Sequence, residues 1–109
     1  MFTLTFPFYI SARNSVEQEL SKAEELWTAG DKDGAVSKYK AVLESNSQKA
    51  ALKDEERAIV YGRLMDYKCE RGNREAAKQW HLDAAKRKVV PVVNHPDAKA
   101  IINSEQKKR

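Results

Sequence analysis

The sequence predicts an all-helical protein in which one helix–turn–helix hairpin is repeated, and three observations support this fold class. The stretch Gly30-Asp31-Lys32-Asp33-Gly34-Ala35 is matched 42 residues later by Gly72-Asn73-Arg74-Glu75-Ala76-Ala77. Each runs glycine, cap-forming residue, base, acid, small residue, alanine, and such repetition indicates a repeat architecture. Glycine and proline are scarce, at 4 and 3 of 109 residues. Apolar residues around the two stretches recur at helical spacing.

Composition narrows the class of protein further. The chain carries 20 basic and 16 acidic residues, a net charge of +4, and one cysteine. Because Cys69 is alone, no internal disulfide forms, which favours a reducing compartment and predicts a cytoplasmic protein. No apolar run is long enough to span a bilayer, and Met1–Ile10 lacks the basic start of a signal peptide. The alternative that the chain is cut from a membrane-anchored parent stays open.

Residues 1–14 are predicted to form an extended apolar arm. Phe2, Leu4, Phe6 and Phe8 alternate with threonine or proline, which is the period of a strand, and Pro7 restricts such a strand to a sheet edge. Three roles for the arm stay open. It packs on its own core, it exchanges between the subunits of a homodimer, or it is the stump of a longer segment.

The helical domain is predicted at residues 15–109, with repeats at about 16–46 and 58–88 and a short C-terminal capping helix at about 96–106. The first helix is expected to begin near Ser15 and to end at Gly30, because glycine readily takes the left-handed conformation that closes a helix. Asp31 then caps the second helix. The result is two antiparallel helix–turn–helix hairpins.

The second hairpin is predicted in the same way. Residues 46–56 form a longer connection with an extra turn, and Asp54 caps a third helix that runs to about Arg71. Gly72 ends this helix, and Asn73 caps the fourth. Val89-Val90-Pro91-Val92-Val93 is predicted to be extended, because β-branched residues around a proline disfavour helix. Pro96 suits the first turn of the capping helix.

The spacing of four positions in each repeat resembles the second half of a tetratricopeptide repeat: Gly30, Ala35, Tyr39 and Val42, then Gly72, Ala77, His81 and Ala84. In that family the glycine turns the chain between two helices, the alanine lets them approach, and the aromatic residue packs into the next repeat. The resemblance covers roughly residues 16–88. The sequence departs from the family in its period of 42 residues instead of about 34, in the histidine that replaces an aromatic residue, and in showing only two repeats.

The resemblance implies a protein–protein interaction or scaffold module without catalysis, which binds a peptide or partner helix in a concave groove. That groove is built from the first helix of each repeat. The partner-binding residues predicted here are Glu17, Leu20, Glu24, Trp27, Ile59, Arg63 and Asp66. The acids predict a basic or amphipathic partner, Arg63 supplies a hydrogen-bond fork, and the apolar members supply contact area. Packing in the core is the alternative role for Trp27.

Two other functions stay open. A basic surface is predicted around the second turn and the following helix, from Arg71, Arg74, Lys78 and Lys86. It would suit a helical nucleic-acid-binding domain, although no aromatic residue alternates with these bases, so nucleic acid is the less favoured partner. A purely structural oligomerisation module is the second alternative. Cys69, His81 and His95 match no metal signature, and the sequence has no phosphate-binding loop, so neither a cofactor nor a metal is predicted.

Overall fold

The computed structural model describes residues 5–107, and within that range it contains helices and connecting turns but no strand. This confirms the prediction of an all-helical fold. The chain divides into two compact units, residues 1–52 and 53–109. The helices are α1 (Thr5–Thr28), α2 (Lys32–Glu44), α3 (Asn46–Ala51), α4 (Asp54–Glu70), α5 (Arg74–Ala85) and α6 (Pro96–Lys107).

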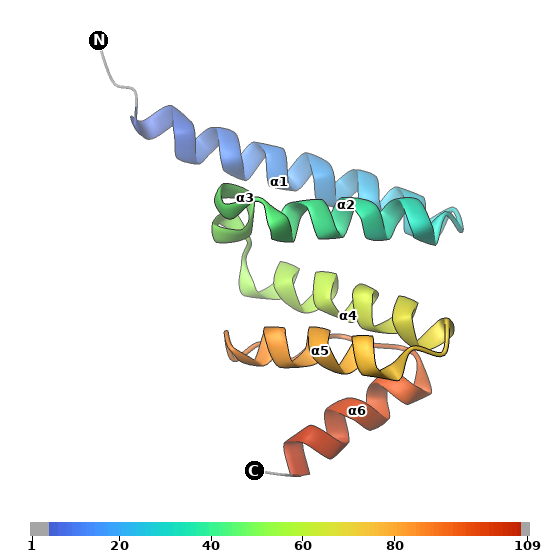
Figure 1. Cartoon of the computed structure of the whole chain (residues 1–109). Helices are drawn as coiled ribbons and strands as arrows, with labels where there is room; N and C mark the ends of the chain where they lie inside the picture. The colour runs from blue at the N-terminus through green and yellow to red at the C-terminus, as the bar shows by residue number, and fades with distance from the viewer. Residues whose placement is uncertain (1–4, 108–109) are drawn as a thin grey trace. The chain divides into compact units, whose positions relative to one another are not determined.

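Each unit contains one antiparallel helical hairpin, α1–α2 in the first and α4–α5 in the second (Figure 1). The first hairpin turns at Gly30, whose φ angle is +97°. Its N–H donates to the Trp27 carbonyl at 3.1 Å, and the Asp31 N–H donates to the Leu26 carbonyl at 2.8 Å. This pair of bonds is the Schellman motif, which satisfies the last carbonyl groups of a helix.

The second hairpin closes with the same hydrogen bonds at positions shifted by one repeat. Gly72 has a φ angle of +77°. Its N–H donates to the Cys69 carbonyl at 3.0 Å, and the Asn73 N–H donates to the Lys68 carbonyl at 2.8 Å. Because both glycines have positive φ and matching partners, the predicted hairpin turns are confirmed, and the repeat is present in the backbone as well as in the sequence.

The residue after each turn glycine caps the following helix, as predicted. Asp31 Oδ1 accepts from the Gly34 N–H at 3.0 Å, and Asn73 Oδ1 accepts from the Ala76 N–H at 3.1 Å. We expect Asp31→Ala to lower the free energy of unfolding by about 1 kcal/mol, because the first turn of α2 then loses its acceptor. Asp31→Asn keeps an acceptor and serves as the control. Equal urea midpoints for the alanine and asparagine variants would contradict this role.

The remaining positions of the repeated pattern are buried in both hairpins. The exposed fractions are 0% for Ala35, Val42, Ala77 and Ala84, 1% for Tyr39 and 5% for His81. Alanine has no side chain beyond Cβ, so it allows two helices to approach closely at these points. His81 therefore occupies the interior position at which the first repeat has tyrosine.

The N-terminal half of α1 differs from the prediction. The helix begins at Thr5, so the part of the predicted arm from residue 5 to residue 14 is helical, and residues 1–4 lie outside the described part. Pro7 lies in the first turn, where backbone N–H groups have no partner within the helix, so proline is tolerated there. Ser15 does not begin the helix. Its hydroxyl accepts a hydrogen bond from Gln48 Nε2 of α3 at 2.8 Å.

The connection between the hairpins contains the short helix α3. Arg13 Nη1 donates to the Ala51 carbonyl at 2.9 Å and so ties α1 to the end of α3. The prediction that Asp54 caps the next helix is wrong by one residue, because Asp54 is the first helical residue and Lys53 is the cap. The Lys53 N–H donates to Glu56 Oε1 at 2.8 Å, which supplies the capping interaction.

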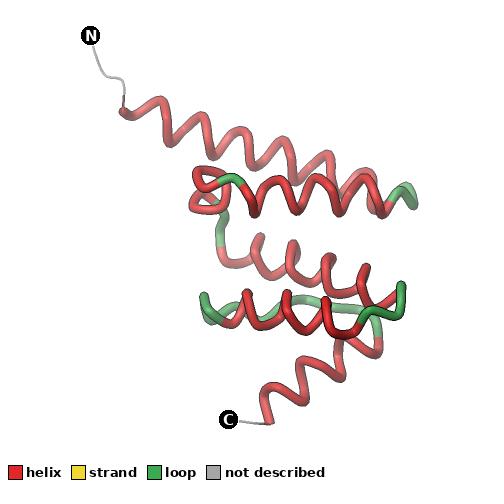
Figure 2. Tube along the Cα trace, viewed as in Figure 1, coloured by secondary structure: helices red, strands yellow, loops and turns green. Residues whose placement is uncertain are grey.

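The second unit has a third layer after its hairpin. Residues 89–95, here called the strap, run back along the hairpin from the end of α5 to the start of α6 (Figure 2). Helix α6 begins at Pro96, as predicted. Its apolar side packs on α4 and α5 in a cluster formed by Met65, Cys69, Ala77, Ala98, Ile101 and Ile102, with Trp80 and Val93 at its margin.

Candidate partner-binding surface

Four predicted partner-binding residues lie on one side of α1. Glu17 and Glu24 are exposed, while Leu20 and Trp27 are half-buried. Their spacing of three, four and three residues brings them to the same side of a helix. Val16 and Ala23, which adjoin this side, are fully buried at 0% exposure. The four side chains therefore line the boundary between the interior of the first unit and solvent.

The two acids on this side are held by specific contacts. Glu17 Oε2 lies 3.3 Å from Arg13 Nη2, one turn earlier on α1. Glu24 Oε1 accepts a hydrogen bond at 3.1 Å from the hydroxyl of Tyr39, whose side chain is buried in α2. A buried tyrosine thus fixes the Glu24 carboxylate at the surface.

Two shallow, open hollows of about 500 and 530 Å³ run along the outer side of α1. Such openness suits a chain segment lying along the helix better than an enclosed small molecule. Acids outnumber bases in their walls, which are formed by Asn14, Glu17, Gln18, Ser21, Lys22 and Glu25 in one hollow and by Ser21, Glu24, Glu25, Thr28 and Ala29 in the other.

Trp27 combines partial burial with a contact at the hairpin turn. The Lys32 ammonium lies 4.8 Å from the centroid of the Trp27 ring, which is within the range of a cation–π interaction. The tryptophan is therefore partly covered by its own chain. Its use as an apolar anchor for a partner stays a prediction.

The matching side of α4 is covered by the strap. The Asp66 carboxylate accepts from the Asn94 N–H at 3.1 and 3.0 Å and from the His95 N–H at 3.0 Å. Asp66 is only 3% exposed. We predicted that Asp66 contributes charge to a groove, but it is buried, because two backbone donors of the strap require an acceptor at that point.

Gly62 allows the strap to touch α4. A Cβ atom at Gly62 would overlap the carbonyl oxygen of Val92 and lie 2.6 Å from its carbonyl carbon. The Val92 N–H donates to the Ala58 carbonyl at 3.0 Å. Val92 and His95 of the strap thus bond to Ala58 and Asp66, which lie about 12 Å apart along the helix axis. Because only three residue steps separate Val92 from His95, the strap must be nearly extended to span most of that distance. The segment that we predicted to be extended is therefore bound to α4 of the same chain.

The other two predicted residues on α4 remain at the surface. Ile59 is 44% exposed and Arg63 is half-buried. They lie one turn apart on α4, in the second unit, whereas Glu17, Leu20, Glu24 and Trp27 lie in the first. The structure thus brings the predicted residues together within each helix, and a groove shared by α1 and α4 stays a prediction.

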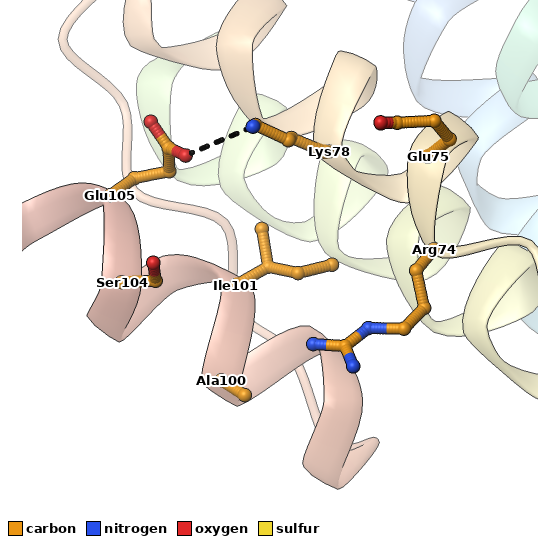
Figure 3. A pocket seen from close by; sticks show the side chains of 7 residues that line it. All are labelled: Arg74, Glu75, Lys78, Ala100, Ile101, Ser104 and Glu105. Atoms are coloured by element: carbon orange, nitrogen blue, oxygen red, sulfur yellow. Dashed lines mark ion pairs between the residues drawn. The ribbon is translucent and has the colours of Figure 1, made fainter.

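A separate pocket of about 440 Å³ lies between α5 and α6. Lys78 Nζ and Glu105 Oε2 form an ion pair at 3.6 Å across it, and Figure 3 shows Ile101 between this pair and the Arg74 side chain. Its walls are formed by Arg74, Glu75, Lys78, Ala100, Ile101, Ser104 and Glu105. Acids and bases are balanced in number here, so the pocket has no clear preference for one sign of charge.

The pKa values of Tyr61 and Cys69 are both raised, and both shifts oppose ionisation. Burial raises the pKa of Tyr61, and the hydrogen bond that its hydroxyl donates to Asp83 Oδ2 at 2.6 Å raises it further. Burial also raises the pKa of the Cys69 thiol. A buried thiol with a raised pKa is a poor nucleophile. Both side chains therefore act as packing groups in the second unit.

The predicted basic surface is divided along α5. Arg71 lies 4.4 Å from the centroid of the Tyr67 ring, and Lys78 pairs with Glu105. Lys86 is exposed at the opposite end of α5 from Arg71. These bases do not form one continuous stripe, so the nucleic-acid alternative gains no observation in its favour.

Comparison with protein-family models, with curated proteins and with solved structures found no match to this chain. Among the described residues, no group of three or more histidine, cysteine, aspartate or glutamate side chains is placed to hold a metal ion. No helix in the described part of the chain is both long enough and apolar enough to cross a membrane. The assignment of function therefore depends on the surfaces themselves.

Proposed function

We propose that this chain is a protein-interaction module that binds a basic or amphipathic segment of another protein along α1. The observation that carries this proposal is the strap on α4. At the α4 positions one repeat after Leu20 and Glu24 stand Gly62 and Asp66, and these two residues seat an extended segment by close approach and by a carboxylate. In the second hairpin, the first helix thus holds an extended chain segment, and we take this as the example for α1, the first helix of the other hairpin.

The equivalent side of α1 differs from that of α4 in two ways. Leu20 replaces Gly62, so a segment on α1 lies further from the helix backbone and contacts side chains. Glu24 replaces Asp66 and is exposed at the surface. Together with Glu17 and Glu25 it gives the hollows along α1 an excess of acid, which attracts a basic segment and repels an acidic one. Leu20 and Trp27 add partly exposed apolar area for an amphipathic partner.

Charge reversal on α1 tests the proposal. The partner retained by the wild-type chain in an affinity pull-down is purified, and its Kd is measured by fluorescence anisotropy. We expect Glu17→Lys combined with Glu24→Lys to weaken binding at least about tenfold, because two attractive contacts become repulsive. Raising the salt concentration should weaken the wild-type complex as well.

A matched control keeps the same change in net charge. Asp33→Lys with Glu44→Lys reverses two exposed acids on α2 of the same unit, and we expect it to leave the Kd within about twofold. Circular dichroism confirms that both double variants remain helical. Equal loss of binding in the two double variants, or no loss in either, would refute α1 as the binding surface.

A further inference from the structure

We propose that a second copy of this chain can supply the strap and α6, so that two chains exchange residues 89–107 and form a domain-swapped dimer. The exchanged element packs on α4 and α5 of the second unit. Every contact that the element makes with that hairpin can be formed equally well by the same element of another copy. The inference is independent of binding at α1.

The hinge for this exchange is the turn that follows α5. The Lys88 N–H donates to the Ala85 carbonyl at 2.9 Å, and the Val89 N–H donates to the Ala84 carbonyl at 3.2 Å. This is the pattern seen at Gly30 and Gly72, but here a lysine holds the left-handed position, with a φ angle of +58°. A side chain with a Cβ atom is strained in that conformation, and opening the turn releases the strain in both chains of a dimer.

The seat on α4 fits the backbone of an extended segment. Gly62 leaves room for a backbone that approaches as closely as that of Val92, and Asp66 accepts from two successive N–H groups of the strap. The opposite side of the strap exposes Val90 at 55% and Val92 at 61%. In a swapped dimer these two side chains remain outside the seat on α4, so the two straps have this apolar surface available to bury against each other next to the opened hinges.

Variants of Lys88 test the hinge with opposite expected signs. Sedimentation equilibrium measures the monomer–dimer Kd of the full chain. Lys88→Gly removes the strain of the closed turn and is expected to weaken dimerisation by on the order of tenfold. Lys88→Pro cannot adopt a positive φ and is expected to strengthen it. Lys86→Gly removes the same charge where φ is −59°, and this control should leave the Kd unchanged.

A disulfide distinguishes exchange from ordinary association. Ala98 of α6 packs in the same buried cluster as Cys69 of α4, so Ala98→Cys places two thiols on the two sides of the exchanged contact. Because burial raises the pKa of the Cys69 thiol, the dimer fraction is oxidised at alkaline pH, and exchange then gives a covalent dimer on a non-reducing denaturing gel. Ala77→Cys pairs α5 with α4, neither of which is exchanged, and should give a covalent monomer.

Three results would overturn the proposal. The first is a monomeric wild type and a monomeric Lys88→Pro variant at protein concentrations near millimolar. The second is a Kd that moves in the same direction in the glycine and proline variants. The third is a covalent monomer from oxidised Ala98→Cys dimer, because the α6 of each chain would then still lie on its own α4.

Discussion

Gly62→Ala is expected to lower the free energy of unfolding of the second unit by about 2–3 kcal/mol, although alanine is the better helix former. The helix-propensity gain of about 1 kcal/mol is outweighed, because the new methyl group would overlap the backbone of the strap at Val92. Backbone atoms held by hydrogen bonds cannot move aside as a side chain can. Urea unfolding followed by circular dichroism measures the loss.

Gly34→Ala provides the matched control for this substitution. The three atoms nearest to its Cβ would all belong to the Asp31 side chain, with Oδ2 at 2.6 Å, and a carboxylate at the surface can rotate away. We therefore expect Gly34→Ala to change the free energy of unfolding by no more than about 1 kcal/mol, with the gain in helix propensity set against a weakened cap. If Gly62→Ala proves as stable as Gly34→Ala, the strap does not lie on α4 as described.

Asp66→Asn is expected to lower the free energy of unfolding by about 2 kcal/mol. It should also weaken the attachment of the strap to α4. The carboxylate accepts from the N–H groups of both Asn94 and His95. In asparagine the single carbonyl oxygen can replace Oδ1, which accepts from both N–H groups. The amide nitrogen then replaces Oδ2 and places a donor about 3.0 Å from the Asn94 N–H, and the negative charge that strengthens both bonds is lost. Hydrogen exchange measured by NMR should show faster exchange of the Asn94 and His95 amides, while that of the Gly72 amide in the hairpin turn stays unchanged.

The same substitution separates a structural role from a binding role for Asp66. If Asp66→Asn weakens partner capture without faster exchange at Asn94 and His95, the carboxylate acts at a binding surface, and the account of the strap is wrong. Faster exchange together with unchanged capture is the expected result. Comparison with Glu24→Gln, at the equivalent position of α1, completes the test, because that change should weaken capture and leave strap exchange unaffected.

The helical hairpins were predictable from the sequence because their signals are local. A glycine followed by Asp31 or Asn73 closes one helix and caps the next through atoms only a few residues apart, and the small and apolar residues that follow at helical spacing define the buried side. The start of α1 was missed, because Pro7 and alternating phenylalanines favour an extended arm, whereas proline is also tolerated in the first turn of a helix.

The covering of α4 by the strap could not be predicted from local patterns, although Gly62 gave one indication of a close contact. A glycine in the middle of a helix, such as Gly62, costs stability unless something approaches closely, and this indicates a contact without naming the partner. Likewise, Asp66 looked like a surface acid, because the strap that buries it lies far along the chain. Sequence spacing shows which residues share a helix face, but it does not show what covers that face.

The helical class, the two glycine turns, the caps Asp31 and Asn73 and most buried positions of the repeat follow from the sequence alone, because each depends on interactions between near neighbours in the chain. The packing of residues 89–95 along α4 and the exposure of the acids on α1 are known only from the folded structure. The strap is held on α4 by the close backbone contact at Gly62 and by the Asp66 carboxylate, which join segments far apart in the chain, and no local pattern predicts such a pairing.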